Sequence, residues 1–432
     1  MSAFPDAAAP CALPGTPLAA AKPGIDACVH CGFCLQACPT YVNLEDENDS
    51  PRGRILLMRS VLEGTLPVDD RDVRTHIDRC LGCRGCETAC PSGVPYGHML
   101  EAMRATLYER QPPPRLARVV LAVFARRRLL TLALLGARLF RATRIPRLLA
   151  RVVPGRLGFA LAMLASTEPA VRARRWTPRG TGARGTATPL VGCVMRGLFG
   201  HTNAATRRVL RENDYEVIDT PGQHCCGALH AHAGALATAR ALARANVTAF
   251  ERTTHDWIVV NSAGCGAMMK DYAELLADDP AWSARARAVS ARVRDVTELL
   301  AEAGPKPADG APSGVSTRVT YDAPCHLLHA QRVATPPLRT LGAMRRVELV
   351  ALVDGDQCCG SAGIYNLVEP DTSDAVLAPK LRHIANTRAP FVATGNPGCL
   401  MQLGAGLRRH DIPVRAVHPV DLLDAAYASS PR

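Results

Sequence analysis

The sequence predicts a mixed α+β and α/β multidomain protein, in which an N-terminal helical module precedes a tandem repeat of α/β cysteine-rich domains. Three observations predict this organisation. The chain has 432 residues, enough for two to four domains of about 100–200 residues each. Eight of its 17 cysteines fall within two short segments, 28–38 and 80–90. In the second half, one cysteine pattern occurs twice with nearly the same spacing.

Residues 1–24 are predicted to be a disordered tail. Proline and glycine interrupt every apolar run there, and the basic region of a secretory signal is missing. No apolar run in the chain reaches the roughly 18–20 residues that span a bilayer. We therefore expect a cytoplasmic protein, where closely spaced cysteines bind metals more often than they form disulfides.

Residues 25–110 are predicted to form a dicluster ferredoxin-type domain. Residues 28–39 read CVHCGFCLQACP and residues 80–91 read CLGCRGCETACP. Both follow C-x2-C-x2-C-x3-C-P, the spacing of bacterial ferredoxins that hold two clusters. Glycines such as Gly32, Gly82 and Gly85 would let backbone N–H groups approach the cluster sulfides.

The spacing also predicts which thiols share a cluster. Three cysteines of one loop bind one cluster, and the fourth, expected at the start of the next helix, reaches the other cluster. We therefore predict two [4Fe-4S] clusters, one bound by Cys28, Cys31, Cys34 and Cys90, and the other by Cys80, Cys83, Cys86 and Cys38. Zinc is the alternative ion, although its sites usually pair two C-x2–4-C motifs. His30 is expected to be a solvated loop residue.

Between the two motifs, residues 50–58 are expected to lead from a loop into a helix. For Arg52 and Arg54 we favour a solvated helix start. The alternative is that they place positive charge near a reduced cluster or contact a partner.

Residues 111–185 are predicted to be a basic helical connector and linker. Residues 111–167 contain eleven arginines, no lysine and no acid, which accounts for most of the net charge of +12. The pattern predicts two or three amphipathic helices broken near Pro146 and Pro154. It favours an anionic partner, either an acidic subunit or the inner membrane face, where the protein would attach peripherally, and the alternative is a plain solvated helical connector. Nucleic acid is not expected, because the segment offers few aromatic side chains for stacking.

Residues 186–305 and 316–432 are predicted to be two cysteine-rich α/β domains. The repeated set is Cys193, Cys225, Cys226 and Cys265 in the first copy, and Cys325, Cys358, Cys359 and Cys399 in the second. Glycine follows each Cys-Cys pair. Every set member follows a predicted strand, and the carboxyl ends of parallel strands meet at one sheet edge. Three interpretations of these cysteines remain open: a further iron-sulfur or metal centre, a scaffold that has lost its metal, and a redox-active thiol pair. The nearby His224, His230, His232 and His326 are expected to be hydrogen-bonded core or rim residues, with metal ligation as the alternative.

Together these motifs resemble the iron-sulfur subunit of bacterial glycolate oxidase over residues 25–430. The resemblance includes SPRGRI at 50–55 and PSGVPYG at 91–97. Similar modules occur in heterodisulfide reductases, lactate-utilisation proteins and the anaerobic glycerol-3-phosphate dehydrogenase. In heterodisulfide reductases each repeat ends in C-x2-C, whereas Met268 and Gln402 stand at the closing positions here.

The resemblance implies an electron-transfer subunit with no catalytic residue of its own. We find no G-x-G-x-x-G after a strand, no Walker loop and no G-x-S-x-G motif. Oxidation of a 2-hydroxy acid releases two electrons at once, so a flavin must stand between substrate and one-electron clusters. We expect FAD on a partner flavoprotein that oxidises glycolate to glyoxylate, and a quinone or other acceptor. The alternatives are a lactate, glycerol 3-phosphate or heterodisulfide system, and a non-enzymatic iron-sulfur scaffold.

Overall fold

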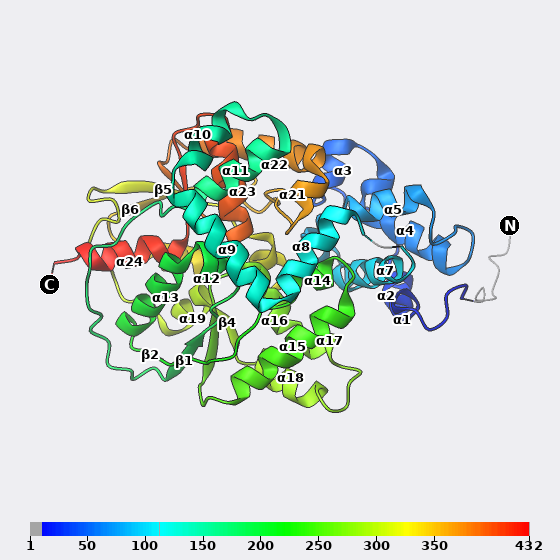
Figure 1. The fold of residues 1–432 in the computed structure, drawn as a ribbon, viewed down its shortest axis with the longest axis horizontal. Coiled ribbons are helices and arrows are strands. Elements are labelled where there is room, and N and C mark those ends of the chain that lie inside the picture. The colour runs from blue at the N-terminus through cyan, green and yellow to red at the C-terminus, as the bar shows by residue number, and fades with distance from the viewer. Residues whose placement is uncertain (1–10, 112, 432) are drawn as a thin grey trace. The chain divides into compact units, whose positions relative to one another are not determined.

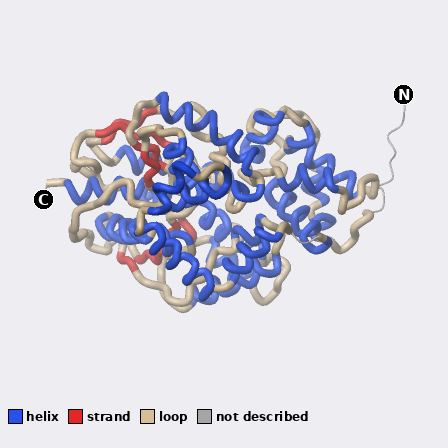
Figure 2. Tube along the Cα trace, turned by 45° about the horizontal axis from the view of Figure 1, so that its top comes forward, coloured by secondary structure: helices blue, strands red, loops and turns tan. Residues whose placement is uncertain are grey.

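The computed structural model describes residues 11–111 and 113–431. The chain forms two compact units (Figure 1): a first unit of Met1–Arg118 with His230–Leu236, and a second unit of Val119–Leu229 with Ala237–Arg432. The described part of the first unit is helical, and all eight strands belong to the second unit (Figure 2). The predicted mixture of a helical module and α/β domains is confirmed.

The first unit consists of short helices around one apolar core. Its elements are α1 (Pro17–Ala20), α2 (Lys22–Asp26), α3 (Pro39–Leu44), the 3-10 helix η1 (Glu47–Asp49), α4 (Pro51–Leu62), α5 (Arg71–Asp78), α6 (Gly85–Ala89) and α7 (Tyr96–Arg110). The core joins Met58 of α4, Ile77 of α5 and Met103 of α7, all fully buried. Cys80 and Cys86 belong to the same core, so helix packing positions the cysteine loops.

The prediction of a disordered tail over 1–24 is wrong for residues 11–24. Leu18 of α1 and Ile25 of α2 are fully buried in the core of the first unit. The Leu18 amide donates to Thr106 Oγ1 of α7 at 3.1 Å. Residues 1–10 lie outside the described residues.

The SPRGRI segment forms a tight entry into α4. The Ser50 hydroxyl accepts from the Gly53 amide at 3.0 Å, and Pro51 occupies the first turn, where no amide donor is needed. A Cβ at Gly53 would lie 2.0 Å from Glu47 O. Only glycine therefore lets η1 pack directly against α4.

The basic connector forms four helices, where two or three were predicted. They are α8 (Arg115–Ala125), α9 (Arg127–Ala142), α10 (Ile145–Val152) and α11 (Gly155–Ser166). The breaks near Pro146 and Pro154 occur as expected, and a further break falls at Arg126. Within the second unit, α11 packs on α23 (Pro397–Arg409) through Ala162 and Ala405. The connector is therefore anchored on the cysteine-rich domains.

Each cysteine-rich copy contains a four-stranded parallel sheet with the same strand order. The first sheet runs β2 (Glu216–Val217), β1 (Thr186–Pro189), β3 (Trp257–Val260), β4 (Val293–Asp295). The second runs β6 (Val347–Val350), β5 (Thr317–Tyr321), β7 (Phe391–Ala393), β8 (Arg415–Val417). Ala187 of β1 pairs with Trp257 of β3, and Val319 of β5 pairs with Phe391 of β7. The cysteine repeat is therefore also a structural repeat.

Helices connect these strands along the chain. In the first copy they are α12 (Val194–Leu198), α13 (Gly200–Glu212), α14 (Ala228–His232), α15 (Leu236–Glu251), α16 (Ala263–Lys270), α17 (Tyr272–Leu275), α18 (Ser283–Ser290) and α19 (Val296–Ala303). In the second copy they are the π-helix η2 (His326–Ala330), α20 (Pro336–Gly342), α21 (Tyr365–Val368), α22 (Pro370–Asn386), α23 and α24 (Pro419–Ser429).

The two sheets share one hydrophobic core. It joins Val259 of β3 to Val319 of β5 and Ala393 of β7, all fully buried. The Ala263 amide donates to Gly395 O at 3.0 Å, which ties the loop after β3 to the loop after β7. The two copies therefore contact each other next to the strand ends that carry cysteines.

Candidate iron-sulfur centres

The first halves of the two ferredoxin-type loops turn in a similar way. Two and four residues after its first cysteine, each loop turns left-handed, with φ of 54° at His30 and 87° at Gly32, and φ of 61° at Gly82 and 63° at Arg84. Such turns aim successive backbone N–H groups into one concavity that suits an anionic cluster. The Gly82 amide lies 3.5 Å from Cys80 Sγ. Gly85 instead begins α6, so only two of the three predicted glycines shape the loops.

One cavity of the first unit gathers the predicted ligands of one cluster. Its lining includes Cys28, Cys31, Cys34 and Cys90. A neighbouring cavity is lined by Cys38, Cys80, Cys83 and Cys86. Cys86, Pro51 and Tyr96 line both cavities, so the two are separated by a single layer of side chains. Each thiol set contains one cysteine from the other motif.

The fourth cysteines reach their cavities in two different ways. Cys38 precedes α3, as the helix-start prediction requires. Cys90 instead ends α6, and the helix lies before it. The prediction is wrong for Cys90 because Gly85 and Cys86 already begin a helical turn within the second motif. His30 is half-buried and lines the first cavity, so it is not a fully solvated loop residue.

In the described residues, no three cysteine sulfurs lie within 4.8 Å of one another, whereas a zinc site needs such close spacing. Four thiolates at about 2.3 Å from one zinc ion lie about 3.8 Å from one another. Among the described residues, only Asp46, Asp49 and His76 form a group of three potential ligands within 4.8 Å of one another. A cubane gives each of its four irons a separate thiolate, and therefore accepts wider spacing.

Burial keeps several of these thiols protonated when no metal is bound. Burial raises the pKa of Cys34 to about 11 and also raises the pKa values of Cys38 and Cys86. Thiolate is the form that binds iron, so a bound cation would displace these protons. The donor set and its surroundings therefore fit an iron-sulfur cluster.

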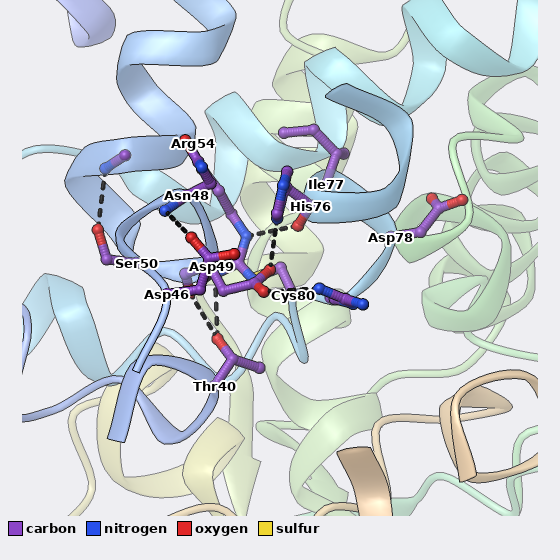
Figure 3. Close-up of polar contacts among 12 residues, drawn as sticks. Thr40, Asp46, Asn48, Asp49, Ser50, Arg54, His76, Ile77, Asp78 and Cys80 are labelled. Atoms are coloured by element: carbon purple, nitrogen blue, oxygen red, sulfur yellow. Dashed lines mark hydrogen bonds and ion pairs between the residues drawn. The ribbon is translucent and has the colours of Figure 1, made fainter. Parts of the chain in front are cut away.

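Arg54 is fully buried and lines the second cavity, and Figure 3 shows its side chain directed at Asp49. Its Nε donates to His76 O at 2.6 Å, its Nη1 to Thr40 Oγ1 at 3.1 Å, and its Nη2 to Asp49 Oδ1 at 3.1 Å. Nη1 also lies 4.0 Å from Cys38 Sγ. The expectation of a solvated helix start is therefore wrong for Arg54. The same expectation agrees with the structure for Arg52, whose side chain is partly exposed and pairs with Glu47.

Further polar groups surround the thiols of the second cavity. Thr40 Oγ1 lies 3.2 Å from Cys38 Sγ, and the Tyr96 hydroxyl donates to Cys80 Sγ at 3.6 Å. Hydrogen bonds and positive charge near the sulfurs stabilise the reduced, more negative state of a cluster. The SPRGRI and PSGVPYG segments already contained Arg54 and Tyr96, but only the fold shows that their side chains lie beside these thiols.

The group of Asp46, Asp49 and His76 is a charge network. The Asp49 carboxylate accepts from Arg54 and, at 3.0 Å, from Arg79. His76 Nδ1 lies 3.1 Å from Asp49 Oδ1 (Figure 3). Two guanidinium groups already neutralise this carboxylate, so it does not need a metal ion.

In the first cysteine-rich copy, the four thiols form a connected set. Cys193 hydrogen-bonds with Cys225, and Cys226 hydrogen-bonds with both Cys225 and Cys265. The hydrogen bond from Cys226 holds the pKa of Cys265 below its ordinary value. A cavity of about 440 Å³ opens beside Cys193 and Cys225.

In the second cysteine-rich copy, the contacts of the four thiols differ from those in the first copy. Cys359 Sγ and Cys399 Sγ lie 3.1 Å apart, and Asn396 Nδ2 donates to Cys399 Sγ at 3.6 Å. Cys358 hydrogen-bonds with Cys359. Cys325 Sγ lies 3.4 Å from the His326 ring.

A buried ion pair, which the sequence did not reveal, accompanies the second set. Lys380 Nζ lies 2.7 Å from Asp322 Oδ1, and both side chains are buried. Burial opposes the charge of Lys380, but the Asp322 carboxylate raises the pKa of Lys380 overall. The charges of Cys358 and Cys359 act on Lys380 in the same direction.

The closing positions of the repeats hold no fifth thiol. Met268 is buried, and Gln402 is fully buried with its amide nitrogen donating to Ser373 Oγ at 2.8 Å. Gly360 has a positive φ of 83°, which favours glycine, and a Cβ there would also lie 2.7 Å from Ser373 O. Both observations explain why glycine follows Cys359.

The four predicted rim histidines separate into two groups. His224 lines the cavity beside Cys193, and His326 adjoins Cys325. His230 and His232 belong to the first unit, where His232 Nδ1 lies 2.8 Å from Glu101 Oε1.

Comparisons with known proteins give the same division of the chain. Residues 24–94 match the family described as 4Fe-4S dicluster domain, and residues 187–270 and 319–404 match the cysteine-rich domain family. The chain is 37% identical over 414 residues to the probable glycolate oxidase iron-sulfur subunit of Bacillus subtilis (strain 168), covering 92% of each chain. It is 34% identical over 400 residues to the glycolate oxidase iron-sulfur subunit of Escherichia coli (strain K12), covering 90% of this chain and 92% of the relative.

A more distant similarity covers part of the chain. Lactate utilization protein A of Geobacillus kaustophilus (strain HTA426) is 28% identical over 235 residues, which is 54% of this chain and 97% of the relative.

Fold, cysteine loops and family matches define an iron-sulfur protein that joins a dicluster domain to two cysteine-rich domains. Within that class, the chain belongs to the family of glycolate oxidase iron-sulfur subunits.

Proposed function

We propose that this chain is the electron-transfer subunit of a glycolate-oxidising complex. It takes electrons from FAD on a partner flavoprotein that converts glycolate to glyoxylate, and passes them towards a quinone or another acceptor. The observation that carries the proposal is the pair of cysteine-lined cavities that share Cys86 and Tyr96 as a common wall. Two clusters so close together suit one-electron transfer after a two-electron oxidation.

For the clusters, the proposed ligand sets are Cys28, Cys31, Cys34 and Cys90, and Cys80, Cys83, Cys86 and Cys38. When bound, each [4Fe-4S] cluster accepts and releases one electron. The chain's own residues hold the thiolates and place the buried Arg54 beside Cys38. The positive charge of Arg54 favours extra negative charge at that site.

The first cysteine-rich copy is proposed to hold a further iron-sulfur or metal centre near the flavoprotein. Its four thiols are linked to one another, and an open cavity lies beside Cys193. We expect the iron content of the anaerobically purified full chain to be higher than the roughly eight irons of two cubanes. Cys225→Ser should reduce the iron content to about eight, whereas Cys11→Ser, outside both patterns, should leave it unchanged. Eight irons and no bound zinc in the unaltered chain would contradict the third centre and leave a docking scaffold.

The location proposed for the chain is the cytoplasmic face of the membrane, with peripheral attachment. All cysteines of the described chain are free thiols, which suits a reducing compartment. Within the described residues, no helix is long and apolar enough to cross a membrane.

The test of the electron-transfer role uses the purified complex with its flavoprotein. Glycolate is added anaerobically, and electron paramagnetic resonance follows cluster reduction. We expect glycolate to reduce the clusters that dithionite reduces. Clusters that respond to dithionite but not to glycolate would refute the proposal. Reduction by lactate alone would support a lactate-oxidising complex, the second candidate, which the similarity to lactate utilization protein A favours.

A further inference from the structure

A cavity of about 600 Å³ lies in the second unit, away from the cysteine sets. Its walls come from α10, α11, the end of α23 and the start of β8. Figure 1 shows α10, α11 and α23 close together within this unit. Cavities that hold small ligands usually measure about 300–1,000 Å³. The volume is therefore sufficient for a headgroup-sized ligand.

The cavity is strongly basic. Five arginines line it, against two carboxylates, and these charged residues are Arg147, Arg151, Arg408, Arg409, Arg415, Glu168 and Asp411. They come from distant parts of the sequence, because α10 belongs to the basic connector and α23 to the second cysteine-rich copy. The fold therefore concentrates positive charge that the sequence distributes over two segments.

These arginines repel one another. Burial first, and then the charges of neighbouring arginines, chiefly Arg147, hold the pKa of Arg408 below its ordinary value, although the Glu168 carboxylate acts in the opposite direction. Glu168 also lines the cavity and partly offsets the positive charge at Arg408 and Arg415, but the arginines outnumber the carboxylates. Convergent guanidinium groups in excess over carboxylates are a typical phosphate-binding arrangement.

The helix beside the cavity exposes an apolar face. On α10, Leu148 is 63% exposed and Val152 is 75% exposed, and Ile145 and Leu149 are also exposed. Apolar side chains next to a basic cluster are typical of proteins that lie on an anionic lipid surface. A soluble phosphate compound would make no use of this face, so the arrangement favours a lipid.

We propose that this cavity binds the headgroup of an anionic phospholipid, with the exposed face of α10 against the acyl region. The inference deepens the membrane attachment proposed above, and it does not depend on glycolate oxidation. It places the attachment at a defined site and not along the whole basic connector.

The test compares two triple variants of the full chain in flotation with vesicles. Arg147→Gln/Arg151→Gln/Arg408→Gln removes three cavity charges. Arg339→Gln/Arg346→Gln/Arg382→Gln removes three arginines of the same unit that lie outside the cavity. Vesicles contain phosphatidylcholine with phosphatidylglycerol, or phosphatidylcholine alone. Thermal unfolding of each variant shows that it is folded.

We expect the cavity variant to lose about a hundredfold in partition onto phosphatidylglycerol vesicles at low salt, since each basic residue at an anionic surface contributes about 1 kcal/mol. The control variant should lose a few-fold at most. A variant of the exposed face of α10, Leu148→Ser/Val152→Ser, should bind more weakly at high salt, where charge is screened.

Equal losses in both triple variants would overturn the site and indicate diffuse charge attraction. If inorganic pyrophosphate stabilises the chain against thermal unfolding, and the chain does not distinguish the two vesicle compositions, the ligand of the cavity is a free phosphate compound and not a lipid. Unchanged vesicle binding together with weaker assembly with the flavoprotein would show that the cavity binds an acidic protein surface and not a lipid. In each case glycolate-dependent cluster reduction is measured separately, so a failure of this proposal leaves the electron-transfer role testable.

Discussion

Replacement of Arg54 by Gln should destabilise the first unit and alter one cluster. Arg54 is fully buried, and its guanidinium donates to His76 O, Thr40 Oγ1 and Asp49. Glutamine is too short to make these contacts and carries no charge. The variant leaves the buried Asp49 carboxylate with Arg79 and His76 as its remaining partners.

The expected loss of unfolding free energy in Arg54→Gln follows from these contacts. Removing one partner of a buried ion pair typically costs about 3–5 kcal/mol. Because Arg79 still neutralises part of the Asp49 charge, we expect the lower end, about 3 kcal/mol. Arg52→Gln, on the same helix, breaks only the partly exposed pair with Glu47 and should cost about 1 kcal/mol or less.

The assay is anaerobic urea unfolding of the full chain. Visible absorbance of the clusters reports the first unit, and circular dichroism reports the whole chain. With a slope of about 1–3 kcal/mol per molar urea, Arg54→Gln should lower the midpoint of the absorbance transition by about 1–3 M. In potentiometric titration, the cluster assigned to Cys38 should become harder to reduce, because a positive charge near its sulfurs is lost.

Two results would refute this reasoning. Unfolding free energies of Arg54→Gln and Arg52→Gln within about 0.5 kcal/mol of each other would show that the Asp49 network does not stabilise the unit. A normal potential for the Cys38 cluster in a folded Arg54→Gln protein would show that the guanidinium does not act on the cluster.

Three further predictions concern other parts of the chain. Cys38→Ser should damage the cluster held with Cys80, Cys83 and Cys86 and largely spare the other; electron paramagnetic resonance showing selective loss of the other cluster would contradict the crossed assignment. Burial raises the pKa of Asp421 to about 7, so the folded state binds a proton that the unfolded state releases above about pH 4. The stability advantage of Asp421→Asn over the unaltered chain should therefore grow between about pH 4 and 7 in denaturant titrations, and a pH-independent difference would argue against this shift. Gly360→Ala should cost about 1–3 kcal/mol because of its positive φ and the nearby Ser373 O, whereas Gly342→Ala, with open space around it, should be neutral or stabilising in the same unfolding measurement.

The sequence alone determined the cluster loops and the repeat. Ligand spacing within a loop is a local property, so eight cysteines in C-x2-C-x2-C-x3-C order already indicate the dicluster domain. The strands before Cys193, Cys265, Cys325 and Cys399 were also predictable, because short apolar runs alternate there with helical segments. Parallel strands then bring those cysteines to one edge of each sheet.

Tertiary structure decided the features that depend on distant partners. Leu18 is ordered because α7 supplies a partner 88 positions away, which tail composition does not reveal. An arginine at a helix start is usually solvated, and Arg54 is buried only because Asp49, Thr40 and the His76 carbonyl converge on it. The basic cavity likewise combines α10 with α23, since guanidinium groups from two segments meet only after α11 has packed between their helices. Burial and long-range charge thus depend on which segments pack together, and local sequence patterns do not carry that information.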